Sequence, residues 1–162
     1  MKRFRYAFVG VVAIGLIAII ILLLAPKSPV LPAIKRQLTS TLLLPQGGGI
    51  RVDPASVKYD ASTKYLSYTA SYAATTLTAS EQPTPETFID IPQTYDKVIL
   101  SMGTYKSFDV GVGTVHITKP QNTNSQQVGV INAKGTLMFV RASKDLTDDQ
   151  WRLFFKTLAI EQ

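Results

Sequence analysis

The sequence predicts an α+β fold in which an N-terminal transmembrane helix precedes an antiparallel sheet with two helices packed on one face. Three observations predict it: a long apolar run near the N-terminus, several segments with a hydrophobic period of two, and two segments with a helical period. We divide the 162-residue chain into a cytoplasmic basic flank (1–6), an anchor helix (7–25), a proline-rich linker (26–37) and an α+β domain (38–162).

The apolar run extends from Ala7 to Ala25 without a charged residue. At about 1.5 Å per residue, a helix of this length spans roughly 28 Å, close to the ~30 Å hydrocarbon core of a bilayer. Lys2, Arg3 and Arg5 lie before the run, so the positive-inside rule places the N-terminus in the cytoplasm and the C-terminal domain outside it. We therefore expect a bacterial single-pass cell-membrane protein with a signal-anchor and an extracytoplasmic domain. A cleaved signal peptide is the alternative, but Leu23 and Pro26 do not suit a cleavage site.

The clearest strand runs from Leu66 to Tyr72, where apolar and hydroxylated side chains alternate. This period of two is typical of an antiparallel strand with one buried face. Residues 132–135 predict a hairpin turn because Gly135 tolerates a positive φ. Further strands are expected at 39–44, 56–59, 76–81, 105–110, 114–118, 127–131 and 136–141.

The first predicted helix has an apolar face formed by Phe88, Ile91, Tyr95, Val98 and Met102. Thr84 followed by Pro85 suggests an N-cap and a first-turn proline. Pro92 lies inside the pattern, so we expect the helix to kink or restart there.

The second predicted helix lies at the C-terminal end of the chain. Thr147 and Gln150 have the spacing of a capping box, and an apolar stripe follows them. The stripe consists of Trp151, Phe154, Phe155 and Leu158. Such a stripe predicts burial against the sheet.

Few residues offer chemistry. The absence of cysteine excludes disulfides, thiol nucleophiles and zinc–thiolate sites. The single histidine, His116, is predicted on the polar face of a strand, and one histidine cannot form a typical zinc site. Glu81 and Glu86 bracket a proline-rich segment, which favours turn or cap roles over paired acid–base catalysis. We predict no catalytic residue, no cofactor and no metal site.

A set of short motifs resembles a family of uncharacterised bacterial single-pass membrane proteins with a small extracytoplasmic α+β domain. The motifs are Val57-Lys58-Tyr59, Leu66-Ser67-Tyr68, Ser80-Glu81-Gln82-Pro83 and Ala133-Lys134-Gly135-Thr136-Leu137, followed by the helix from Leu146 to Leu158. The resemblance covers residues 38–160, and similar domains form the outer parts of some anti-sigma-like regulators. It implies no functional residues, and we expect no cytoplasmic part that would bind a sigma factor, because about six residues precede the predicted anchor.

The expected function is non-enzymatic binding or an envelope-associated role. The expected partners are the membrane, through Ala7–Ala25, and an envelope protein or lipid. Nucleic acid is not expected, because the 14 basic residues after residue 26 nearly balance 11 acidic residues. Two alternatives remain open: a carrier of a lipid or other hydrophobic ligand, and a hydrolase that uses His116 with a serine and an aspartate.

Overall fold

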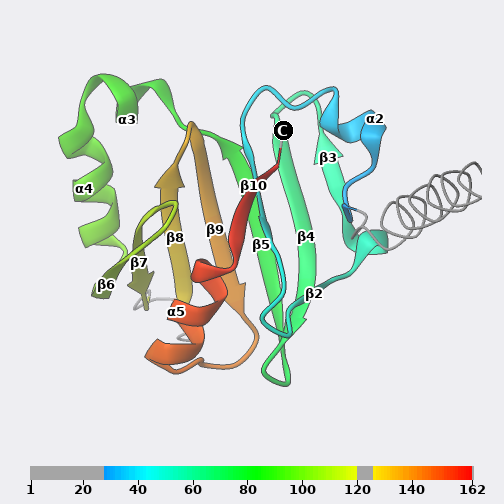
Figure 1. Cartoon of the computed structure of the whole chain (residues 1–162). Helices are drawn as coiled ribbons and strands as arrows, with labels where there is room; N and C mark the ends of the chain where they lie inside the picture. Colours follow the sequence, from blue (N-terminus) through cyan, green and yellow to red (C-terminus); the bar gives the residue numbers. More distant parts are fainter. Residues whose placement is uncertain (1–27, 120–125, 162) are drawn as a thin grey trace, which may run out of the picture.

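A computed structural model describes residues 28–119 and 126–161, which form a mostly-sheet α+β domain (Figure 1). Its large antiparallel sheet has eight strands in the order β2-β4-β5-β9-β8-β7-β6, with β3 also paired to β4. These strands are β2 (Arg51–Val52), β3 (Lys58–Asp60), β4 (Tyr65–Tyr72), β5 (Thr75–Pro83), β6 (Thr104–Val110), β7 (Gly113–Thr118), β8 (Val128–Ala133) and β9 (Thr136–Ala142). The helices are α2 (Pro32–Lys35), α3 (Glu86–Asp90), α4 (Pro92–Ser101) and α5 (Asp148–Lys156), with a 3₁₀ turn, η1, at Pro54–Ser56.

Two further strands, β1 (Leu42–Pro45) and β10 (Leu158–Glu161), form a separate antiparallel pair that we call the arm. The arm brings the first and last described residues together, since the Ser28 hydroxyl donates a 2.7 Å hydrogen bond to Glu161 Oε2. Lys35 pairs with the same carboxylate. Burial alone would raise the pKa of Glu161, but hydrogen bonds from Lys35 and Ser28 lower it below its ordinary value.

Tight turns connect the strands of each hairpin. Ala73 and Ala74, between β4 and β5, both have positive φ (49° and 57°). Lys134 and Gly135 repeat this arrangement between β8 and β9, with φ of 54° and 80°. Two consecutive positive-φ residues produce the twist that suits a two-residue hairpin. The pairing of β5 with β9, from Leu77 opposite Ala142 to Pro83 opposite Thr136, then joins the two halves of the sheet.

We call the side of the sheet covered by the arm and α5 the arm face (Figure 1). The aromatic stripe of α5 lies on this face, and Trp151, Phe154 and Phe155 are completely buried, as predicted. Gly129 on β8 makes room for them, because a Cβ atom there would lie 2.6 Å from the Phe155 ring. The main core therefore sits between the sheet, α5 and the arm.

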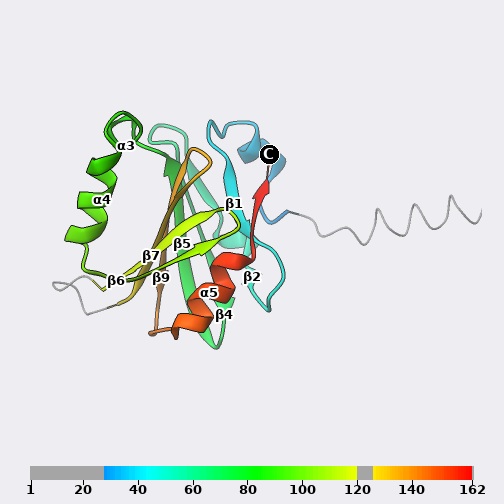
Figure 2. The same cartoon turned by 60° about the vertical axis from the view of Figure 1, so that its left-hand side comes forward.

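The opposite side, the α4 face, carries a smaller core. Ile99 of α4 packs with Val128, Val130 and Leu137 from β8 and β9. Because successive strand residues point to opposite faces, Val130 contacts α4 while Gly129 meets α5. Figure 2 shows α4 and α5 on the two sides of the sheet.

The prediction that two helices pack on one face is therefore wrong. There are four helices among the described residues, and α4 and α5 cover opposite faces. The physical reason lies in β8 and β9, most of whose residues are buried regardless of the face to which they point. A strand that is covered on both faces does not alternate between apolar and polar residues. Its sequence therefore does not show which face a helix covers.

The transmembrane part of the predicted fold is also corrected. Across residues 28–119 and 126–161, no helix combines the length and the apolar character that crossing a membrane requires. The segment predicted as the anchor, 7–25, lies outside the described residues. The transmembrane helix and the single-pass, signal-anchor and extracytoplasmic assignments based on it are withdrawn.

Several predicted boundaries also change. The Thr147–Gln150 capping box is confirmed, but α5 ends at Lys156, and Leu158 begins strand β10 instead of extending the helix. The break at Pro92 is confirmed and separates α3 from α4. Thr84 does not cap α3, because its hydroxyl donates to Asn132 Oδ1 at 2.6 Å.

Candidate functional site

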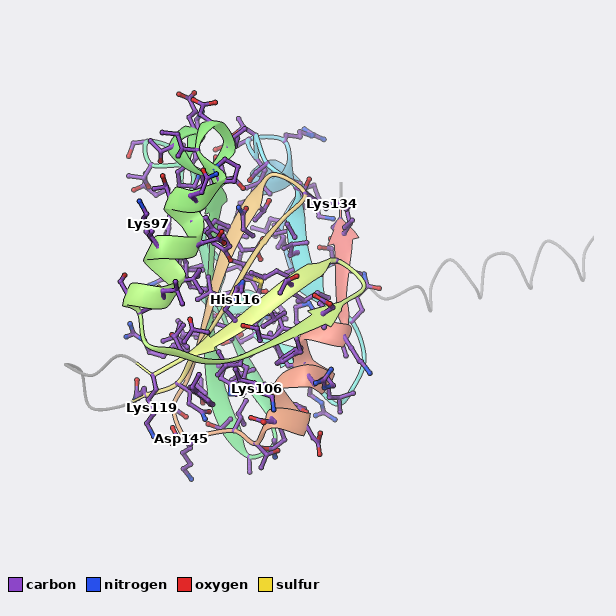
Figure 3. All side chains as sticks on the ribbon, turned by 90° about the vertical axis from the view of Figure 1, so that its left-hand side faces the viewer. Lys97, Lys106, His116, Lys119, Lys134 and Asp145 are labelled. Carbon is purple, nitrogen blue, oxygen red and sulfur yellow. The ribbon has the colours of Figure 1, made fainter. Side chains whose placement is uncertain are left out.

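His116 lies on β7 and points toward the α4 face, in register with Val130. Its ring meets the Tyr95 ring edge-on with centroids 5.8 Å apart, and its Nδ1 lies 2.9 Å from the Ser107 hydroxyl of β6. Figure 3 views the molecule from the β6–β7 side, with α4 and α5 to either side of the labelled His116. The histidine is therefore half-buried beneath α4 and not simply solvated.

The surroundings of His116 do not form a Ser–His–Asp arrangement. Burial lowers the pKa of His116 below its ordinary value, and the charge of Asp96 opposes this effect. No carboxylate hydrogen-bonds the imidazole within the described part of the chain, so its second nitrogen has no orienting acid. A triad needs that acid to fix the tautomer of a histidine that activates serine.

Glu81 has a different role from the predicted turn or cap. It lies within β5 on the arm face, with 3% of its surface exposed, whereas Glu86 is exposed in the first turn of α3. Glu81 Oε2 accepts a 2.9 Å hydrogen bond from the backbone N–H of Leu43 in β1. Its Oε1 is buried and has no hydrogen-bond partner in the described residues. Burial raises the pKa of Glu81 to about 8, so the carboxyl is largely protonated at neutral pH.

Three side chains of the sheet hold the edge of β1 that faces away from β10. Glu81 accepts from the Leu43 N–H, and the Tyr68 hydroxyl donates to the Leu43 carbonyl oxygen at 3.1 Å. Thr136 donates from its hydroxyl to the carbonyl oxygen of Thr41. Pro45, two residues after Leu43, has no N–H to satisfy on this edge. We call Tyr68, Glu81 and Thr136 the clamp.

The α4 face of β4 and β5 carries a regular array of hydroxyl groups. Directly opposite residues lie on the same face of an antiparallel pair. The pairs here are Ser67 with Ser80, Thr69 with Thr78, and Ser71 with Thr76. We call these six residues the hydroxyl ladder. None of their six hydroxyls makes a hydrogen bond to another described residue, and all six residues are at least partly exposed.

An open groove of about 350 Å³ lies along the ladder. Its walls include Ser67, Thr69 and Thr78 of the ladder, together with Ser56 of η1 and Asp53 directly before it. α3 and α4 do not cover this part of the sheet, because the smaller core involves β8 and β9.

Basic side chains flank the hydroxyl ladder on both sides. Arg51 is opposite Ser71, Lys58 is opposite Ser67, and Arg141 is opposite Thr78. All three are exposed, and none forms a salt bridge with another described residue.

The acidic residues next to the ladder accept hydrogen bonds within their own turns. Asp53 Oδ1 accepts from the Ala55 N–H, and Asp60 Oδ1 accepts from the N–H and hydroxyl of Ser62. The hydroxyl ladder presents free donors, and its flanks carry three basic residues against these two acids.

The other acidic residues considered for chemistry have structural partners. Asp145 pairs with Lys119 at 3.0 Å, and Asp148 pairs with Lys106 at 2.9 Å. Figure 3 labels Asp145, Lys119 and Lys106. Asp148 and Asp149 also lie in the first turn of α5, where negative charge is favourable. Within the described residues, no group of three or more His, Cys, Asp or Glu side chains could hold a metal ion.

Sequence reasoning missed both the clamp and the hydroxyl ladder as sites. The serines and threonines of β4 and β5 were visible as the polar half of an alternating pattern. Their lack of internal partners was not visible, because it depends on which part of the sheet the helices leave open. Glu81 occupies an apolar position of β5, between Ala79 and Pro83 in the same alternation, and that position was the available signal.

No protein-family model matches this chain, and no similar curated protein or solved structure was found. The resemblance to bacterial proteins with a small α+β domain stays a prediction.

Proposed function

We propose that this domain is a non-enzymatic binding module whose hydroxyl ladder holds an extended acidic polysaccharide. The observation that carries the proposal is the ladder of six hydroxyls without partners among the described residues, with an open groove at Ser67, Thr69 and Thr78 and basic residues in register on both sides. One solvated face is common in antiparallel sheets. Here the groove and the basic residues distinguish this face from an ordinary solvated surface.

The chemistry of the ladder suits a polyhydroxylated chain. Each serine or threonine hydroxyl is both a donor and an acceptor, as are the hydroxyls of a sugar. Opposite side chains in the ladder are about 5 Å apart, so the array repeats at intervals along and across the strands. Tyr65, 40% exposed at the start of β4, offers an aromatic edge beside the array.

The basic residues beside the ladder favour an acidic polysaccharide over a neutral one. Arg51, Lys58 and Arg141 would attract carboxylate or sulfate groups, and Arg can bind such groups through two parallel hydrogen bonds. Asp53 and Asp60 each lie in a local turn, and the three basic residues outnumber these two acids.

A titration of the full ¹⁵N-labelled chain tests the proposal. Polygalacturonate, as the acidic probe, should shift the amide signals of β4 and β5, and dextran, as a neutral probe, should do so much less. Added salt should weaken binding, because exposed charges are screened. Shifts confined to other elements, or equal binding of dextran, would contradict the proposal.

Matched variants locate the surface. The double substitution Lys58→Ala with Arg141→Ala should weaken polygalacturonate binding at least tenfold, roughly the effect of losing 1.4 kcal/mol. Lys156→Ala removes an exposed basic residue from α5, on the arm-face side, and should leave binding unchanged. A loss of binding in the control variant would indicate non-specific attraction to the basic chain.

The other two hypotheses have less support. The arm face, where a hydrophobic ligand would lie, is filled by completely buried side chains of α5. The hydrolase hypothesis requires an acid on His116, and the described residues do not supply one through a hydrogen bond.

A further inference from the structure

The arm is attached to the large sheet in an unusual way. Within the arm, β1 and β10 pair through backbone hydrogen bonds, and the Gln46 N–H continues this ladder to the Thr157 carbonyl oxygen. In an antiparallel pair, alternate residues direct their backbone groups away from the partner strand. Leu43 lies at such a position, and side chains of the clamp take the place of a neighbouring strand.

The only ionisable carboxyl of the clamp is Glu81. Its Oε2 holds Leu43, whereas its Oε1 is enclosed without a partner. Among the described residues it forms no salt bridge. In this position a neutral carboxyl costs less than an ionised one, which is a buried charge without an ion-pair partner among the described residues.

Neighbouring groups offset that charge only in part: hydrogen bonds from the Leu43 N–H and from Tyr68 lower the pKa of Glu81, and burial outweighs both. Tyr68 from β4 is buried beside Glu81, and burial raises its pKa well above its ordinary value, so it stays neutral. The neighbouring positions in register, Leu66 on β4 and Met138 on β9, are apolar. In the arm and the segment before it, Glu161 and Lys35 pair with each other. On α5, Arg152 lies over the Phe108 ring, and Asp148 pairs with Lys106.

We infer that the arm is a proton-locked cover: protonated Glu81 keeps β1 on the arm face, and loss of this proton to solvent releases β1 and β10. Release hydrates the carboxylate and frees Leu43 from the clamp. It also exposes apolar side chains of β1, including Leu42 and Leu44, which are at most 3% exposed in the closed arrangement.

Amide hydrogen exchange, measured for each residue of the full chain, tests this inference. After correction for the exchange rate of an unprotected amide, opening at Leu42–Leu44 should increase about tenfold per pH unit between pH 5 and 8, and then level off. The amides of Val130 and Ile131 in β8 should remain more protected at every pH, because release of the arm leaves β8 paired on both sides.

Two variants separate the proton lock from general fragility. Glu81→Gln keeps the shape without the charge, so the corrected opening of the arm should become independent of pH. Glu161→Gln removes the other carboxylate of the arm and should keep the tenfold rise. Carbon NMR of the Glu81 carboxyl in the wild-type chain supplies a reading that does not depend on any variant.

The inference is overturned if Glu81 titrates near its ordinary value. It is also overturned if the arm amides exchange only as fast as those of β8, or if Glu81→Gln retains the wild-type pH dependence. These measurements do not depend on polysaccharide binding at the hydroxyl ladder.

Discussion

On the arm face, α5 buries Trp151, Phe154 and Phe155 completely, whereas on the α4 face Ile99 is the one buried residue of α4 and Leu100 is 72% exposed. The beginnings of the two helices differ as well. α5 starts with a complete capping box, but α4 starts at Pro92 without a side-chain cap. The comparison shows that α5 is specified by its own sequence and by its core, whereas α4 depends mainly on docking to β8 and β9.

The largest expected effect concerns the clamp on the arm face. The pKa of Glu81 is raised to about 8 in the folded chain and returns toward 4.5 on unfolding, so folding takes up a proton between these values. The contribution of Glu81 to stability should be full below pH 4.5, fall as the pH rises to 8, and then level off, with a total loss of as much as about 5 kcal/mol. Urea denaturation of wild type and Glu81→Gln at several pH values measures the difference. Parallel curves for the two proteins would contradict the prediction.

Truncation of the main core should come next. Trp151→Ala removes a completely buried ring and its 2.8 Å hydrogen bond to Gln127 Oε1. We expect a loss of about 3–5 kcal/mol in the free energy of unfolding, measured by chemical denaturation. A loss below 1 kcal/mol would mean that the arm face is not the principal core.

A smaller loss is expected on the α4 face. Ile99→Ala removes the central apolar contact of α4, and we expect a cost of about 2 kcal/mol, at the lower end for such a truncation. Hydrogen exchange should show α4 losing protection before α5 does. Equal destabilisation of both helices would remove the distinction between the two faces.

The smallest effect tests the helix starts. Thr147→Ala removes the capping hydroxyl of α5 and should cost about 1 kcal/mol. Thr94→Ala, in the first turn of the uncapped α4, should change stability by less than about 0.5 kcal/mol. Thermal denaturation of the two variants side by side provides the comparison, and an equal or larger effect at Thr94 would contradict it.

Features encoded over a few residues were predictable from the sequence. The alternation in β4, the break at Pro92 and the capping box at Thr147 all follow from local spacing, and the structure confirms them. Thr84 shows how a local signal fails, since its hydroxyl was expected at a helix start but bonds Asn132, 48 residues away in sequence.

Features that depend on distant pairing were not predictable. The β5–β9 register and the β1–β10 arm join segments far apart in the chain, so no local period marks them. Leu158 fits a helical stripe, yet it lies in β10 because α5 ends at Lys156 and the chain turns to pair with β1. The candidate sites share this property, since the clamp and the hydroxyl ladder are each defined by what another part of the fold covers or leaves open.

The bond between Ser28 and Glu161 has a practical consequence for rearranging the chain. Because the first and last described residues meet, a short linker could join them and new ends could be opened in an exposed turn such as Lys134-Gly135. Such a circular permutant would retain every strand pairing of the large sheet. For the same reason, residues 28–161 could be inserted into a surface loop of a host protein, and the two host residues that flank the insert could stay close together.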